Sequence, residues 1–220
     1  MRMLAVLLFA AMPALAQDPA AISVLERREL AIESSVASPT HSLRLTLAYQ
    51  EGGGWAAETI QSAVRQSAQM LAQCRVALSK VELIRFDAPR RFHIYYTPIS
   101  RELARVLPLP RPTIYFVAGT RQRPAFDAEA IGRANSRTRP ELADTVWLTR
   151  ATRDPGIALA HELAHVLMDS GEHSDEEGNL MRADTAPGNV RLSPAQCARL
   201  RATGSANALL LQGATSATVR

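Results

Sequence analysis

The sequence predicts a mixed α/β domain, and three features support this fold class. Short apolar or alternating segments typical of strands occur at residues 42–49, 81–86, 113–117 and 145–149. Apolar residues recur at helical spacing over residues 55–78, which predicts a long amphipathic first helix. A second helix, over residues 157–168, is apolar on nearly every face and must be buried. This order of elements favours a twisted sheet covered by helices.

The first 16 residues have the features of a secretory signal peptide. They contain one positive charge, an apolar run too short to span a bilayer, and a final Ala-Leu-Ala. Cleavage after Ala16 would direct the protein to the periplasm or the extracellular space, with no membrane span in the mature chain; a membrane anchor is the alternative interpretation. The mature chain would have 204 residues (220 less 16), which suits one domain with a sizeable core.

The remaining chain divides into an extension, a domain and a tail. Residues 17–41 have no strong pattern beyond a possible short helix at 22–32, and we interpret them as an N-terminal extension, with a propeptide remnant as one reading. The domain would occupy residues 42–204. Residues 205–220 are rich in Ala, Ser, Thr and Gly, which predicts a flexible tail.

The middle of the chain has fewer clear elements. Residues 91–96 are a candidate strand. Four prolines predict irregular connections after it: Pro98, Pro108, Pro110 and Pro112. Residues 120–144 are polar and rich in arginine, with a short apolar segment at 130–134.

Charge and cysteine content narrow the function classes. The formal net charge of +4 falls to +3 without Arg2. With no nucleic acid motif present, so small an excess of positive charge gives no reason to expect nucleic acid binding, although an acidic partner or an anionic cell surface remains an alternative.

Cys74 and Cys197 are the only cysteines, and export would favour one disulfide between them. Two buried free thiols are the alternative.

Three polar side chains interrupt the buried helix. Asp154 is a suitable N-cap and Pro155 suits the first helical position, so the helix should begin there. Because residues four apart lie one turn above each other, His161 and His165 can bind one metal ion, and Glu162 beside them can take a proton from a water. The alternative is two core histidines satisfied by hydrogen bonds, but an apolar helix has little reason to bury these groups unpaired.

A catalytic zinc ion usually has three protein ligands and one open position for water. His173 is the expected third ligand, since Gly171 in a left-handed conformation could end the helix and turn the chain back. Alternative third ligands are Asp169, Glu172 and Asp175. Asp184, the only acidic residue after Glu177, is a further alternative. The other two histidines, His41 and His93, are expected to be structural.

The segment resembles the signature of the metzincin clan of zinc peptidases, which is a His-Glu-x-x-His helix, a glycine turn, a third histidine, and a later turn containing methionine. The matching residues are His161, Glu162, His165, Gly171, His173 and Met181 within Asn-Leu-Met. One spacing departs from the clan, because His173 lies eight residues after His165, two more than usual.

The resemblance implies a zincin-like fold: a mostly parallel twisted sheet with an antiparallel edge strand, and a small C-terminal subdomain ending in a helix near residues 192–201. It implies a supporting place for Met181 beneath the ligands, and it is consistent with a disulfide between the first and last helices. Residues 131–135 lie where such peptidases have the strand that pairs with extended substrate, although a plain loop is an equal alternative.

Together these observations predict a secreted or periplasmic zinc-dependent endopeptidase with one Zn²⁺ per chain. Zinc would be held by His161, His165 and His173, and Glu162 would be the general base that deprotonates the attacking water. The expected partner is a peptide or protein substrate, and a monomer is assumed by default. Two alternatives remain open: a zinc-stabilised binding or envelope-assembly module without catalysis, and a zinc amidase that acts on cell-wall peptides.

Overall fold

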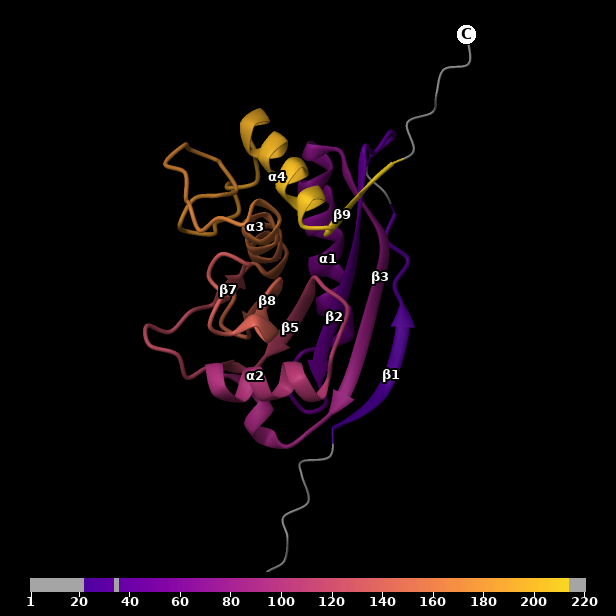
Figure 1. Cartoon of the computed structure of the whole chain (residues 1–220), viewed down its shortest axis with the longest axis vertical. Helices are drawn as coiled ribbons and strands as arrows, with labels where there is room; N and C mark the ends of the chain where they lie inside the picture. Colours follow the sequence, from indigo (N-terminus) through magenta and orange to yellow (C-terminus); the bar gives the residue numbers. More distant parts are fainter. Residues whose placement is uncertain (1–21, 34–35, 214–220) are drawn as a thin grey trace, which may run out of the picture.

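A twisted seven-stranded sheet forms the centre of the protein in the computed structural model, which describes residues 22–33 and 36–213 (Figure 1). The strands are β1 (Ser23–Glu29), β2 (His41–Gln50), β3 (Val76–Asp87), β5 (Thr113–Val117), β7 (Ala128–Ile131), β8 (Thr145–Thr149) and β9 (Leu210–Gln212). Their order is β1-β3-β2-β5-β8-β7, and β9 pairs with the start of β2. Two short strands, β4 (Ile94–Tyr95) and β6 (Gly119–Thr120), form a separate ribbon.

The four central strands β3, β2, β5 and β8 are parallel, while β1 and β7 are antiparallel edge strands. This arrangement confirms the predicted mixed α/β fold class with a mostly parallel sheet. Strands β5 and β8 are buried on both faces, which explains their continuous apolar sequences. Within the described residues, no helix is long and apolar enough to cross a membrane.

Helices cover both faces of the sheet. Helices α1 (Ala57–Leu71), α3 (Pro155–Met168) and α4 (Pro194–Ala206) lie on one side, and α2 (Thr97–Val106) lies on the other (Figure 1). Neighbouring residues of β8 show the alternation, because Val146 belongs to the core under α1 and α3, whereas Trp147 belongs to the core under α2. The first core is the one that positions α3.

The N-terminal extension was wrongly separated from the domain, and its expected helix is a strand. β1 pairs with β3, and ion pairs cross between the two strands, with 3.2 Å from Arg27 to Glu82 and 3.3 Å from Arg85 to Glu26. The sequence of β1 is mostly charged and has no strand periodicity. Its conformation is determined by the free edge of β3, a tertiary interaction that a local pattern does not show.

Three elements between residues 57 and 106 also differ from expectation. α1 ends at Leu71, and after a 3₁₀ turn Arg75 adopts a left-handed conformation, so β3 begins at Val76 rather than at residue 81. The stretch after Tyr96 is not irregular but forms α2. Pro98 lies in its first turn, where the missing N–H has no intrahelical partner to lose. Of the candidate strand at 91–96, only Ile94 and Tyr95 form a strand, β4.

The first part of the predicted tail belongs to the fold. α4 continues to Ala206, and β9 then pairs with β2, with Leu209 and Leu210 buried in the core. The residues at 205–213 were therefore wrongly assigned to a flexible tail, because Leu209 and Leu210 provide apolar side chains that the core buries. The proposed signal peptide and residues 214–220 lie outside the described residues.

The disulfide expected from the sequence is present between Cys74, just after α1, and Cys197 in α4. It joins residues 123 positions apart and fastens the last helix to the end of the first. Both sulfurs are buried in the core that surrounds α3.

We predict that the Cys74→Ser, Cys197→Ser double variant loses about 5 kcal/mol of unfolding free energy, because a cross-link over so long a loop restricts the unfolded chain. The measurement is urea denaturation of the oxidised wild type and the variant, both with chelator. Wild-type protein treated with reductant is the control and should match the variant. Equal midpoints for all three samples would show that the bridge contributes nothing.

Candidate metal centre

Helix α3 carries the candidate site and is buried along almost its whole length, from Gly156 to Met168. Close packing against α1 begins at Gly156, where a Cβ atom would lie 2.1 Å from Gln66 Oε1 and 2.7 Å from its Cβ. A larger residue there would push the two helices apart. Pro155 occupies the first turn as expected, but the Asp154 side chain makes no capping hydrogen bond and lies 3.8 Å from Arg153 Nε. Helix packing, rather than a cap, fixes the start of α3.

Two backbone carbonyls orient the imidazoles on α3. His161 Nδ1 lies 2.7 Å from the Leu180 carbonyl oxygen, and His165 Nδ1 lies 2.6 Å from the Ser170 carbonyl oxygen. Because a carbonyl can only accept a hydrogen bond, both Nδ1 atoms carry the proton and both Nε2 atoms present lone pairs. This is the usual outer contact of metal-binding histidines.

The two Nε2 atoms point at each other across 2.9 Å. Burial lowers the pKa of both imidazoles, and that of His165 falls to about 4, with the neighbouring His161 contributing to the shift. At neutral pH neither Nε2 carries a proton, so the facing lone pairs suit a shared cation. Two ligands on a tetrahedral zinc lie about 3.3 Å apart, given Zn–N bonds of about 2.05 Å.

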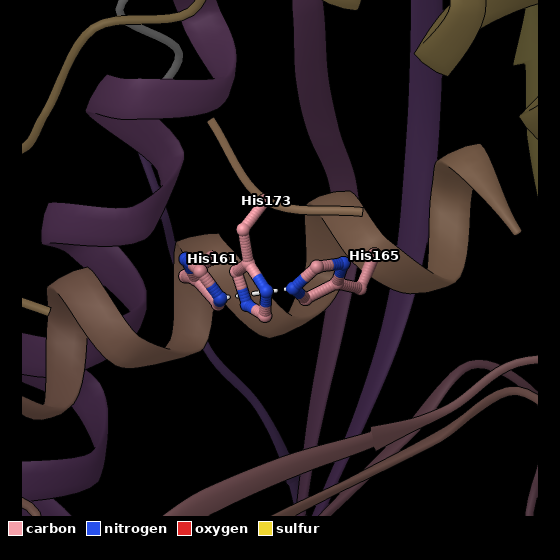
Figure 2. Close-up of side chains that lie close together, drawn as sticks. All are labelled: His161, His165 and His173. Atoms are coloured by element: carbon pink, nitrogen blue, oxygen red, sulfur yellow. Dashed lines mark hydrogen bonds between the residues drawn. The ribbon is translucent and has the colours of Figure 1, made fainter. Parts of the chain in front are cut away.

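His173 completes the group. Its ring centroid lies 5.4 Å from that of His161 and 5.0 Å from that of His165. One nitrogen from each of the three rings lies within 4.8 Å of the others. Figure 2 shows His173 reaching down from the segment above α3 towards the nitrogens of the other two rings. The residues present therefore fit a three-histidine zinc site.

The turn between α3 and His173 differs from the one expected. Asp169, not Gly171, adopts the left-handed conformation that ends the helix, with φ of 45°. Asp adopts this conformation more readily than most residues because its side chain is short and polar. Here Asp169 Oδ1 accepts a hydrogen bond from the distant Ala134 amide, at 2.9 Å. The longer spacing to His173 is taken up by the residues after this turn.

The turn containing Met181 holds the His173 segment in place. Met181 is buried, and its carbonyl accepts a hydrogen bond from the Ser174 amide next to His173, at 2.8 Å. Buried Asn179 organises the turn, since its side chain accepts from the Met181 amide and exchanges hydrogen bonds with the Gln196 side chain. The same Gln196 belongs to the capping box of α4. These hydrogen bonds join the segment that carries His173 to the turn at Met181, and that turn to α4.

The alternative third ligands have other partners. Asp169 binds the Ala134 amide, and the Glu172 side chain accepts from Arg199 and Ser170. Within the described residues, only the three histidines form a group with metal-binding geometry, so neither Asp175 nor Asp184 joins it. His41 and His93 lie elsewhere, beside Thr40 and the Glu51 carbonyl.

Glu162 lies beside the histidines and is only 8% exposed. Burial, with a smaller contribution from the charge of Glu129, raises the pKa of Glu162 to about 8, while the Ala130 amide opposes this shift by favouring the carboxylate. A cation held by the three imidazoles would also favour the ionised form. Glu162 is therefore placed to accept a proton, and its pKa lies near the neutral pH at which a general base works best.

An open cavity of about 860 Å³ lies over these residues. Its walls include the edge strand β7, the turn after α3 and the segment 183–186. β7 ends at Ile131, so the expected substrate-pairing segment is a strand placed three residues earlier than residues 131–135. The site therefore combines a buried glutamate, three converging imidazoles and an edge strand.

Sequence reasoning missed three residues that shape this site: Glu129, Asp169 in its structural role, and Gln196. Glu129 had no signal, because it lies in a polar segment without clear periodicity. The capping box of Ser193 and Gln196 follows a recognisable pattern, but its contact with Asn179 joins residues 17 positions apart and is visible only in the fold.

No protein-family profile matches the chain, and no curated protein matches it in sequence. Among solved structures, the crystal structure of metalloproteinase-II from Bacteroides fragilis matches with 20% sequence identity and a TM-score of 0.49. The match covers 80% of this chain and 57% of that one, so this chain spans little more than half of the other protein. Assignment of the site therefore depends on the geometry of its own residues.

We predict that His173→Ala lowers the zinc content of the purified protein more than Asp169→Ala or Asp175→Ala does, because only His173 directs a nitrogen at the other two. The measurement is metal analysis after dialysis against a weak chelator, with about one zinc expected for the wild type. If either aspartate variant lost more zinc than His173→Ala, the third ligand would be wrongly assigned.

We predict that the chelator-treated protein loses stability as the pH falls from 6.5 towards 4. The unfolded chain protonates His165 near pH 6.5, whereas the folded chain resists protonation until about pH 4, so acid favours unfolding. The contribution of His165 is about 3 kcal/mol. Urea denaturation across this range should give a shallower loss for His165→Gln than for the wild type; identical slopes would contradict the assignment.

Proposed function

We propose that the protein is a zinc-dependent peptidase of the secreted or periplasmic compartment. The observation that carries the proposal is the convergence of His161, His165 and His173 beside the buried Glu162, at the base of an open cavity. A purely structural zinc site is closed by four protein ligands and needs no base. This site offers three ligands and a carboxylate, the arrangement of a hydrolytic centre.

The chemistry divides between the metal and the chain. When bound, zinc would act as a Lewis acid that lowers the pKa of water and polarises a carbonyl group. The three imidazoles would hold it, and the carbonyl oxygens of Leu180 and Ser170 keep two of them in the tautomer that offers Nε2. Glu162 takes the proton of the attacking water and transfers it to the leaving amine. Its apolar surroundings keep its affinity for the proton high.

The free edge of β7 supports a peptide as the substrate. Asp127 accepts a hydrogen bond from the Thr149 amide, and pairs alternate along an antiparallel ladder. The backbone groups of Ala128 and Ala130 therefore face away from β8, and the amide of Ala130 lies near the Glu162 carboxylate. An extended peptide can pair with such an edge through main-chain hydrogen bonds and so bring its carbonyl groups past the zinc site.

The disulfide bears on the cellular compartment, and Glu162 bears on the two alternative functions. The disulfide is compatible with an oxidising compartment, as expected for an exported protein. A cell-wall peptide or another amide would use the same residues, and a binding module would use the histidines without Glu162. These alternatives differ in what they predict for a Glu162 variant.

We predict that Glu162→Gln retains zinc but hydrolyses a mixed peptide library at least about a hundredfold more slowly, because the water loses its proton acceptor while the ligands are unchanged. Zinc content and initial rates are measured on the same samples. Chelator-treated wild type, with and without restored zinc, is the control.

Undiminished hydrolysis by Glu162→Gln would remove the proposed base. Zinc retained by a wild type that cleaves neither peptides nor cell-wall fragments would instead support the binding module. Cleavage of cell-wall fragments alone would identify the amidase.

A further inference from the structure

We propose that Glu129 is a specificity-determining residue that binds a lysine or arginine side chain of the substrate. The inference rests on the proposed function and names the class of peptide that the site prefers. It follows from the place of Glu129 on β7, from its lack of a partner, and from the charge of the cavity around it.

Glu129 occupies the middle of the edge strand and lines the cavity, half-buried. Its backbone is paired with Trp147 of β8, so the strand holds the side chain in a fixed direction. The two residues on either side of it, Ala128 and Ala130, pack their side chains against the core under α3. Glu129 therefore faces the opposite side of the strand, and it is the charged side chain of β7 that a paired peptide would meet.

Among the described residues, the side chain of Glu129 forms no hydrogen bond and no ion pair. Arg139 attracts the Glu129 carboxylate electrostatically, but its guanidinium donates to the Tyr95 hydroxyl at 3.3 Å. Burial raises the pKa of Glu129, as expected of a carboxylate that has lost part of its water without gaining a partner. A half-buried acceptor of this kind gains more from a cation than an exposed one does.

The lining of the cavity has a charge opposite to that of the whole protein. The formal net charge of the chain is +4, but the lining contains five carboxylates and a single arginine, Arg153. The five are Asp127, Glu129, Glu162, Asp169 and Asp184. Of these, Glu162 is the proposed base and Asp169 is bound to the Ala134 amide. Glu129 is the one that lies on the strand whose edge would hold the peptide.

Pairing with β7 explains why the cation should belong to a peptide side chain. Side chains of an extended peptide alternate between the two faces, as those of β7 do. Every second residue would therefore lie on the face where Glu129 lies, within reach of a long cationic side chain. Lysine and arginine can span this distance while their backbone remains paired with the strand edge.

The test compares zinc-loaded wild type with Glu129→Gln, on peptides that differ at one position in carrying lysine, arginine, leucine or glutamate. We expect the wild type to cleave the cationic peptides best, and the ratio of kcat/KM for lysine over leucine to fall about tenfold in Glu129→Gln. Glu129→Lys should shift the preference towards glutamate. Glu58→Gln, which changes the same charge on the exposed start of α1, is the matched control and should leave the ratio unchanged.

Binding of the same peptides to the zinc-loaded Glu162→Gln protein, with and without Glu129→Gln, separates recognition from hydrolysis. Efficient cleavage without a cationic preference, or equal ratios for Glu129→Gln and Glu58→Gln, would overturn the role of Glu129 and leave the peptidase standing. Absence of cleavage by the wild type, with Glu129-dependent binding of cationic peptides, would overturn the peptidase and support the recognition. Absence of both would overturn both.

Discussion

The site depends on two short hydrogen bonds between imidazoles and backbone carbonyls. His161 is held by the carbonyl of Leu180, and His165 by the carbonyl of Ser170. Each bond fixes a tautomer and a ring orientation, and each also connects α3 to a segment that follows it in the chain. A shift of either segment would therefore rotate a ligand as well as move a loop.

The carbonyl of Leu180 is itself held by a chain of contacts that reaches the last helix. Asn179 is buried with its amide fully used, by Glu176, by the Met181 amide and by Gln196. Gln196 in turn caps α4, and α4 is tied to the end of α1 by the disulfide. The small C-terminal region has little sheet of its own to pack against, so polar contacts and a covalent bond provide its order. The second carbonyl, that of Ser170, follows the turn at Asp169, and the Ser170 hydroxyl donates to the Glu172 side chain and accepts from the Glu172 amide.

The sequence was informative where the decisive interactions are local. The spacing of His161 and His165, the apolar character of α3 and the strands at β5 and β8 could all be predicted, because helical and strand periodicities act within a few residues. Elements decided by distant contacts could not. β1 is a strand because β3 offers it an edge, and the left-handed residue after α3 is Asp169, whose side chain accepts a hydrogen bond from the Ala134 amide, 35 residues away. The place of His173 beside the other two imidazoles could be expected because a catalytic zinc needs a third ligand, but the turn that brings it there was expected at Gly171 and occurs at Asp169.

The cost of burying these polar groups indicates what completes the fold. Two neutral imidazoles face each other through lone pairs, and a carboxylate lies beside them with a pKa raised to about 8. Packing alone does not offset such an arrangement, because hydrophobic neighbours provide neither a proton nor a counter-charge. A divalent cation reverses the sign of every one of these interactions: lone pairs become ligands, and the carboxylate gains a positive neighbour. Binding free energy of this kind adds to folding free energy, so a metal ion held by the three imidazoles would also stabilise α3.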